Sequence, residues 1–287
     1  MAPAMAEPTR LDQIAAELDA ARLAAREIDQ FAGRVDLSLA DAYRVLLRGI
    51  DLRHGRGEQV VGVKLGFTSR EKAEQMGVAD VILGVLTDQM QVTVGGHLDH
   101  GTLIHPRVEP EIAFRLAEGV PVSALAKDFL AHVTHVSAAV EVIDSRYHNF
   151  SFSLADVVAD NTSASHFAVG DWLPVTDELR HGGLGDLAVT LTIDGAPVAA
   201  GSTKAILGDP FEALVAAQRL TGTHGHPIVP GGIILAGSAT AAVQLPADAT
   251  VEVVVAGLGA VTVHTSRRAV EAQALWTRRF RGSAACE

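Results

Sequence analysis

The sequence predicts an α+β fold, in which a helical N-terminal region precedes a mixed β-sheet domain of barrel or roll type. Leu11 to Phe31 is rich in Ala, Leu and Glu, with apolar residues at helical spacing, and from Met90 onward β-branched runs and turn signals dominate. The chain lacks the regular strand–helix alternation of a nucleotide-binding fold. We therefore divide the 287 residues into a helical region, 1–58, and a β-rich domain, 59–287.

The elements of the first third follow from caps and glycines. After the helix over Leu11–Phe31, Ser38 is placed to N-cap a second helix from Leu39 to about His54. Residues 60–67 are β-branched and punctuated by glycine, which predicts a strand that another group approaches closely. A short helix is expected from Thr68–Glu71 to near Gly77, with Ser69 as its cap.

The later elements are two hairpins and one helix. Asp194-Gly195 is a strong hairpin signal between two apolar runs, and Gly257-Leu258-Gly259 joins a second pair of runs. A helix packed on the sheet is expected between the hairpins. The predicted strands are 187–193, 196–199, 251–255 and 260–264, and the predicted helix is 210–220.

Composition and charge exclude several functions. With 48% hydrophobic but only 5% aromatic residues, the chain can bury a large aliphatic core. A formal charge of −11 argues against binding nucleic acid or an anionic membrane, but small anionic substrates remain open. The single cysteine, Cys286, excludes an internal disulfide framework, and no segment has the pattern of a signal peptide or membrane helix. We expect a cytoplasmic protein.

Three glutamates form the main candidate site. Glu109 and Glu111 lie one residue apart, so on a strand they share a face, and Glu141 interrupts an apolar run about 30 residues later. Adjacent buried carboxylates need a positive partner, and three on neighbouring strands would make a hard oxygen site for Mg2+ or Mn2+. The alternatives are a solvated strand face for the pair and, for Glu141, a salt bridge to Arg107 or Arg146.

Lys64 is the second candidate, because it interrupts the apolar strand between two glycines. Its ammonium either snorkels outward or points at a buried anion. Two clusters of small polar residues, 160–166 and 237–240, could hydrogen-bond a carboxylate, although such residues also form ordinary caps and turns. His224 and His226, in a glycine-rich turn, could bind a metal only weakly.

Five motifs occur together along the chain. They are Gly-Val-Lys-Leu-Gly-Phe-Thr-Ser at 62–69, Gly-x-Leu-Thr-Asp-x-Met at 84–90, His-Pro-Arg-Val-Glu-Pro-Glu-Ile-Ala-Phe at 105–114, Glu-Val-Ile-Asp-Ser-Arg-Tyr at 141–147 and Val-Ala-Asp-Asn at 158–161. Together they resemble the fumarylacetoacetate hydrolase superfamily. Within it, they are similar to the branch that holds 2-oxopent-4-enoate hydratases and 4-oxalocrotonate (2-oxohex-3-enedioate) decarboxylases of aromatic meta-cleavage.

The resemblance implies a fumarylacetoacetate hydrolase-type fold over 59–287 and a metal-dependent enzyme. By this resemblance, Glu109, Glu111 and Glu141 hold Mg2+ or Mn2+, and Lys64 lines the site of a small 2-oxo dicarboxylate substrate. It also implies a homo-oligomer and association with the pathway hydratase.

Hydratases and decarboxylases of this branch differ near two segments. Hydratases typically carry a Pro-Asp-Phe-Gly element, whereas this chain has Val81-Ile82-Leu83-Gly84, with no carboxylate at the aspartate's place. Residues 144–152 resemble the decarboxylase pattern Asp-Ser-Arg-Tyr-x-Asn-Phe-x-Phe. The chain departs from both subfamilies at Val81, where proline is usual, and at Thr162, where a smaller residue is usual.

We therefore expect decarboxylation of 2-oxohex-3-enedioate, with the metal chelating the 1-carboxylate and 2-oxo oxygens and stabilising the dienolate left by CO2. Lys64 would position an anionic group or protonate the intermediate. Hydrogen bonds to the carboxylate ends are expected from Asn161, Ser163, Ser165 and Thr240. The alternatives are a hydratase at the same metal site and a non-catalytic metal-binding assembly partner.

Overall fold

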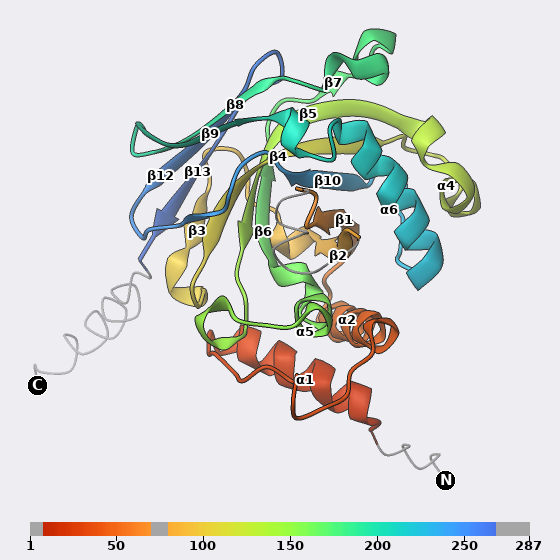
Figure 1. Cartoon of the computed structure of the whole chain (residues 1–287), viewed down its shortest axis with the longest axis vertical. Coiled ribbons are helices and arrows are strands. Elements are labelled where there is room, and N and C mark those ends of the chain that lie inside the picture. Colours follow the sequence, from red (N-terminus) through yellow and green to blue (C-terminus); the bar gives the residue numbers. More distant parts are fainter. Residues whose placement is uncertain (1–7, 70–79, 268–287) are drawn as a thin grey trace, which may run out of the picture.

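The structure is a computed structural model that describes residues 8–69 and 80–267. Figure 1 shows two β-sheets, with helices α1 and α2 at one end of the molecule and α6 beside the larger sheet. The α+β class with N-terminal helices is confirmed. Within the described ranges, the larger sheet follows an open path, β2-β1-β10-β4-β5-β6, rather than a closed barrel. The short helix expected to end near Gly77 lies outside the described residues.

The larger sheet has eight strands and positions the candidate site. Short strands β11 and β7 pair with β4 and β5 respectively. Its strands are β1 (Val60–Gly66), β2 (Ile82–Thr87), β4 (Arg107–Leu116), β5 (Val133–Ile143), β6 (Ala164–Val169), β7 (Leu173–Pro174), β10 (Ile233–Ser238) and β11 (Val243–Gln244).

The smaller sheet has five strands in the order β3-β13-β12-β8-β9 and contains both predicted hairpins. Asp194 and Gly195 both have positive φ, as the two central residues of a tight hairpin turn require. Antiparallel pairing of β8 with β9 and of β12 with β13 confirms the hairpin prediction at both places. The strands are β3 (His97–Asp99), β8 (Ala188–Ile193), β9 (Ala196–Ser202), β12 (Thr250–Val255) and β13 (Gly259–Ser266).

The helices confirm the cap predicted at Ser38 and correct one boundary, while the helix that Ser69 was expected to cap lies outside the described residues. Ser38 accepts a hydrogen bond from the Asp41 N–H and caps α2, as predicted. The helices are α1 (Arg10–Leu23), α2 (Leu39–His54), α4 (Val122–Asp128), α5 (Leu154–Ala159) and α6 (Pro210–His224). Short 3₁₀ turns are η1 (Asp88–Met90), η2 (His100–Thr102), η3 (Leu130–His132), η4 (His148–Phe150), η5 (Asn161–Ser163) and η7 (Thr203–Ala205), and η6 (Leu179–Gly183) is a π turn.

The prediction that the first helix continues to Phe31 was wrong. Helix α1 ends at Leu23, and Ala25 takes a positive φ of 45°. The chain then leaves the helix because the Ile28 N–H donates to the Arg146 carbonyl, and the Ile28 carbonyl accepts from the His148 N–H. A tertiary backbone pairing thus overrides a local sequence with good helix propensity.

An ion pair joins the two N-terminal helical segments to each other, and hydrogen bonds attach this region to the sheet. Arg56 makes two short contacts with Asp19, at 2.7 and 2.8 Å. Glu58 accepts from the Thr87 hydroxyl at the end of β2. The Tyr43 hydroxyl accepts from the Leu83 N–H inside β2. These contacts fix the strand that carries Ile82 against α2.

The strand predicted at 60–67 is also confirmed, including its close approach to another group. A Cβ on Gly62 would lie 1.9 Å from the Ile233 carbonyl oxygen, so only glycine fits where β1 pairs with β10.

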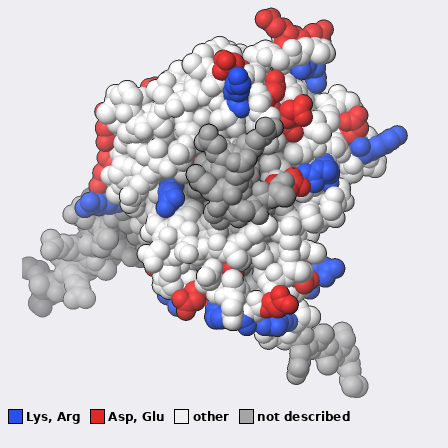
Figure 2. Space-filling model, viewed as in Figure 1, with Lys and Arg blue, Asp and Glu red and all other residues white. Residues whose placement is uncertain are grey.

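The surface charge is mixed. On the face shown in Figure 2, acidic and basic side chains are interspersed rather than gathered into one field. Among the residues that the structure describes, no helix is both long enough and apolar enough to cross a membrane.

Buried His226 predicts an acid-sensitive fold. Neither ring nitrogen has a hydrogen-bond partner among the described residues, and burial lowers the pKa of His226 from 6.5 to about 4. The unfolded chain therefore binds the proton more readily, and stability is lost as the pH falls from 6.5 towards 4. Replacement by Phe should reduce the loss of unfolding free energy between pH 6.5 and 4 by up to about 3 kcal/mol. The free energy of unfolding measured at several pH values tests this. The same change at exposed His181 should leave the dependence intact, and an unchanged slope in H226F would contradict the prediction.

Candidate active site

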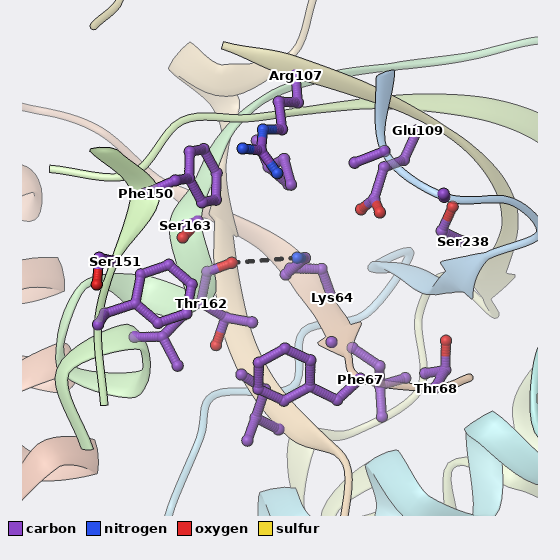
Figure 3. A pocket seen from close by; sticks show the side chains of 18 residues that line it. Lys64, Phe67, Thr68, Arg107, Glu109, Phe150, Ser151, Thr162, Ser163 and Ser238 are labelled. Carbon is purple, nitrogen blue, oxygen red and sulfur yellow. Dashed lines mark hydrogen bonds between the residues drawn. The ribbon is translucent and has the colours of Figure 1, made fainter. Parts of the chain in front are cut away.

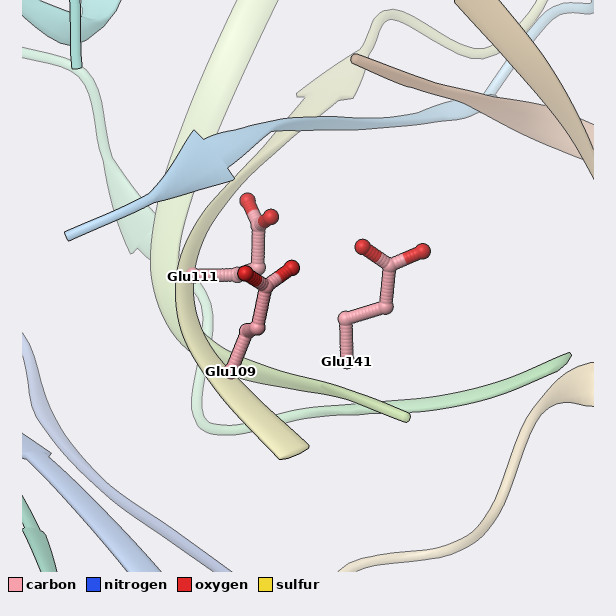
Figure 4. Close-up of side chains that lie close together, drawn as sticks. All are labelled: Glu109, Glu111 and Glu141. Atoms are coloured by element: carbon pink, nitrogen blue, oxygen red, sulfur yellow. The ribbon is translucent and has the colours of Figure 1, made fainter. Parts of the chain in front are cut away.

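Strands β4 and β5 bring the three glutamates together. Glu109 lies directly opposite Glu141 in the antiparallel register, and Glu111 follows on the same face of β4. Carboxylate oxygens from all three residues lie within 4.8 Å of one another, and all three side chains are buried. Figure 4 shows the three side chains close together, two extending from one strand and one from its neighbour. The solvated strand face, the alternative for the pair, does not describe this arrangement.

The electrostatics of the cluster call for a cation. Burial, then the charges of Glu141 and Glu109, raise the pKa of Glu111 well above its ordinary value, against the opposing effects of Lys64 and of the Gly237 N–H. That N–H donates to Glu111 Oε2 at 2.6 Å, whereas buried Oε1 accepts no hydrogen bond from the described residues. The cluster therefore offers three carboxylates, and one of their buried oxygens accepts no hydrogen bond from the described residues. Such hard oxygen donors fit a divalent cation such as Mg2+ or Mn2+.

Lys64 supplies the one positive charge that contacts this cluster among the described residues. It extends from β1, is 2% exposed, and places Nζ 3.0 Å from Glu141 Oε2 and 3.2 Å from the Thr162 carbonyl oxygen. Burial alone would lower the pKa of Lys64, but the three glutamates, Glu141 foremost, outweigh burial and raise it. Lys64 is therefore a buried cation that faces an anion, not a snorkelling side chain. Arg146, the other partner considered for Glu141, is paired with Asp160 instead.

A cavity of about 520 Å³ adjoins Lys64 and Glu109. Figure 3 shows Lys64 in its centre, with Arg107 and Glu109 on one side and aromatic rings around it. The polar lining side chains are Lys64, Thr68, Arg107, Glu109, Ser151, Thr162, Ser163 and Ser238, and the larger apolar ones are Leu65, Phe67, Ile82, Ile143, Phe150, Phe152 and Val157. The cavity thus combines a charged floor with apolar walls, as small-molecule sites do.

The turn η5 holds part of the cavity wall in an uncommon backbone conformation. Asn161, Thr162 and Ser163 all have positive φ, between 52° and 55°. The Asn161 amide stabilises the turn by accepting from the Val85 N–H and donating to the Val85 carbonyl. The turn directs the Thr162 carbonyl to Lys64 and leaves the buried Ser163 hydroxyl without a partner in the described part of the chain. Ser163 is therefore available to a ligand.

Three of the residues expected to contact the substrate do not line the cavity. Asn161 does not line the cavity, because both ends of its amide are engaged by Val85. Ser165 is hydrogen-bonded to His166, and its side chain also lies outside the lining. Thr240 is outside it too, while its hydrogen-bonded neighbour Ser238 lines the cavity. The contacts of Asn161, Ser165 and Thr240 with a substrate stay predictions, and the structure shows Asn161 holding the η5 turn through Val85.

Several lining residues were not predicted. Arg107 was considered only as a partner of Glu141, although its position two residues before Glu109 places it on the same face of β4. Phe150 and Phe152 were named only as part of the motif at 144–152. They lie two residues apart, and this spacing was the signal that could have identified them as a pair. The pair His224 and His226 forms no part of the glutamate cluster and packs instead around Tyr43.

Comparisons with known proteins place the chain in a family. The sequence profile "Fumarylacetoacetate (FAA) hydrolase C-terminal" matches residues 84–265. A 4-oxalocrotonate decarboxylase of Pseudomonas sp. is 42% identical over 258 residues, which are 90% of this chain and 98% of that protein. A 2-keto-4-pentenoate hydratase of Paraburkholderia phymatum is 32% identical over 262 residues, 90% of this chain and 98% of that protein.

The structural comparison agrees. The 4-oxalocrotonate decarboxylase of Pseudomonas putida G7, solved with magnesium and adipate, superposes with a TM-score of 0.81 at 33% identity, covering 89% of this chain and 97% of that one. The protein belongs to the fumarylacetoacetate hydrolase family. Its relatives at 30% identity or more include both lyase types of the branch, decarboxylases and hydratases.

The glutamate cluster predicts a measurable response to metal. Adding Mg2+ or Mn2+ should stabilise the fold, by about 2.7 kcal/mol at a hundredfold excess over Kd. The variant Glu111→Gln should lose this stabilisation but be at least as stable as the parent without metal, because it removes one buried charge from the cluster. Thermal unfolding with and without metal measures both effects. Glu118→Gln, at an exposed position just beyond β4, is the control, and a full metal response in E111Q would contradict the site.

Proposed function

We propose that the protein is a divalent-metal-dependent decarboxylase in aromatic meta-cleavage catabolism. Its substrate would be 2-oxohex-3-enedioate (4-oxalocrotonate) and its products 2-hydroxypenta-2,4-dienoate and CO2. The higher identity to a decarboxylase than to a hydratase supports this choice, as does a decarboxylase neighbour that binds magnesium and adipate, a six-carbon dicarboxylate. Glu109, Glu111 and Glu141 would hold the metal, with Mg2+ or Mn2+ as the cofactor.

The observation that carries the choice of reaction is the apolar side chain of Ile82 in the cavity wall. By the family resemblance, hydratases carry a proton-transferring aspartate at this position. Ile82 cannot transfer a proton, and with Phe67, Phe150 and Phe152 it makes this part of the wall apolar. An apolar wall disfavours an ordered attacking water and suits loss of CO2, which requires no water.

The residues of the chain have distinct roles in this proposal. The bound cation would supply a Lewis acid that stabilises negative charge on the carbonyl oxygen. Lys64, kept protonated by the glutamates, would orient the substrate's anionic oxygens and deliver a proton to the dienolate after CO2 leaves. Ser163 would donate a hydrogen bond to the 1-carboxylate, since its hydroxyl lines the cavity and has no partner among the described residues.

The second candidate is a 2-oxopent-4-enoate hydratase at the same metal site. It is favoured by the relatives named as hydratases, and both reactions share a dienolate and therefore the same glutamates. A non-catalytic assembly partner is a weaker alternative, because a decarboxylase neighbour binds a substrate-sized dicarboxylate.

Activity assays decide between these candidates. We expect metal-dependent CO2 release from 2-oxohex-3-enedioate and little water addition to 2-hydroxypenta-2,4-dienoate. The variant Lys64→Met should reduce CO2 release at saturating metal by at least about 100-fold, because a general acid contributes that much. Lys127→Met, an exposed position on α4, is the control. Rapid hydration without CO2 release would establish the hydratase instead, and full activity in K64M would remove Lys64 from the mechanism.

We also propose that the chain forms a homo-oligomer and associates with the hydratase that consumes its product. The family resemblance supports this, and so does the chemistry, since the product is an enol that ketonises in water and benefits from direct transfer. Light scattering should give a mass above 30.0 kDa, and the two enzymes should co-elute when mixed. A monomer that elutes separately from the hydratase would contradict both statements.

A further inference from the structure

Arg107 is a second cation in the cavity lining, and its surroundings differ from those of Lys64. Among the described lining residues, Lys64 and Arg107 are the two that carry positive charge. Lys64 is buried and paired with Glu141, whereas Arg107 is exposed at the rim and makes no ion pair with any described residue. Within the described part of the cavity lining, one cation is therefore committed to the glutamates, and the other can meet a ligand.

Backbone geometry sets the distance between Arg107 and the metal cluster. Arg107, Glu109 and Glu111 alternate along β4 and so share one face, forming a row of one cation and two carboxylates. Residues i and i+2 of a strand are about 6.8 Å apart, close to the length of an extended six-carbon chain. A dicarboxylate with its 2-oxo acid end at the cluster would thus have its other end within reach of Arg107.

The guanidinium is held in place by an aromatic ring. Its central carbon lies 4.3 Å from the centroid of the Phe150 ring, and Figure 3 shows both side chains at the same edge of the cavity. Phe150 is itself packed against the rings of His105 and Phe152, at 5.1 and 5.8 Å between centroids. This contact with the ring holds the guanidinium at the edge of the cavity, and a guanidinium over a ring can still donate its N–H groups to a carboxylate.

We propose that Arg107 is the specificity residue that binds the distal carboxylate of the substrate, an inference that rests on the proposed function. The distal carboxylate is the one that leaves. When the C5–C6 bond breaks, its electron pair passes into the dienolate, which takes up a proton, and neutral CO2 departs. The ion pair with Arg107 ends at that moment. Arg107 therefore selects the dianionic substrate over shorter or uncharged analogues and does not retain the monoanionic product.

The test compares two unreactive 2-oxo acids of equal length. With Mg2+ present, calorimetry measures the Kd of 2-oxohexanedioate, which has the distal carboxylate, and of 2-oxohexanoate, which lacks it. We expect the wild-type protein to bind the diacid at least tenfold more tightly. The variant Arg107→Gln should abolish this preference while its Kd for 2-oxohexanoate stays unchanged, and that unchanged Kd also shows that the site is folded.

Two further variants sharpen the result. Arg107→Lys keeps the charge but loses the planar fork, so it should keep only part of the preference. Arg115→Gln is the matched control, because Arg115 lies on the same strand and also packs over an aromatic ring, that of Trp172, but outside the cavity. It should behave as the wild type.

The outcomes separate the two proposals. A preference for the diacid that persists in R107Q, or that is absent from the wild type, overturns the role of Arg107 and leaves the metal site standing. Failure of the wild type to bind either acid with Mg2+ overturns the proposed function, and the role of Arg107 with it.

Discussion

The structure depends on one constraint, the burial of three carboxylates beside the Lys64 ammonium. Glu109, Glu111 and Glu141 repel one another in a region of low dielectric, and Lys64 offsets only part of that repulsion. Such an arrangement persists only if the surrounding fold enforces it. The enforcing element is the ten-residue register between β4 and β5, because a slip of one residue would turn all the glutamates of one strand to the opposite face. The glutamate cluster therefore depends on the long central pairing of β4 with β5.

A glycine in β2 makes room for Lys64 and the η5 turn beside that cluster. Lys64 and the η5 turn occupy the same side of β2, and a Cβ on Gly84 would lie 3.0 Å from the Lys64 Cδ and 2.8 Å from the Asn161 carbonyl oxygen. The glycine is needed for this close approach, not for chain flexibility. The Asn161 amide then fastens the turn to Val85. Asn161 thus fixes the backbone whose Thr162 carbonyl accepts from Lys64 at the cavity.

These layers explain which parts of the protein the sequence alone predicts. Features encoded within a few residues were predicted well, such as the Ser38 cap, the Asp194-Gly195 turn and the shared face of Glu109 and Glu111. Features set by distant partners were not. The end of α1 depends on Ile28 pairing with the segment at Arg146, and the role of Asn161 depends on Val85, 76 residues earlier. The alternation of side chains along a strand could have placed Arg107 on the same face as Glu109. Its contact with Phe150, from another part of the chain, could not be predicted in this way.

The same reasoning separates the metal centre from the choice of reaction. Hydration and decarboxylation both pass through a dienolate, so the glutamates and Lys64 can serve either, and their geometry does not discriminate. Discrimination has to come from the walls, because hydration needs an ordered water and a wall residue that exchanges a proton with it, whereas loss of CO2 needs neither and would take its one proton from Lys64. Ile82 and the rings of Phe150 and Phe152 offer neither, while Arg107 offers a cation at the rim where a second carboxylate would lie. A monocarboxylic hydratase substrate would leave that cation without a partner, whereas a dicarboxylate would engage both ends of the cavity.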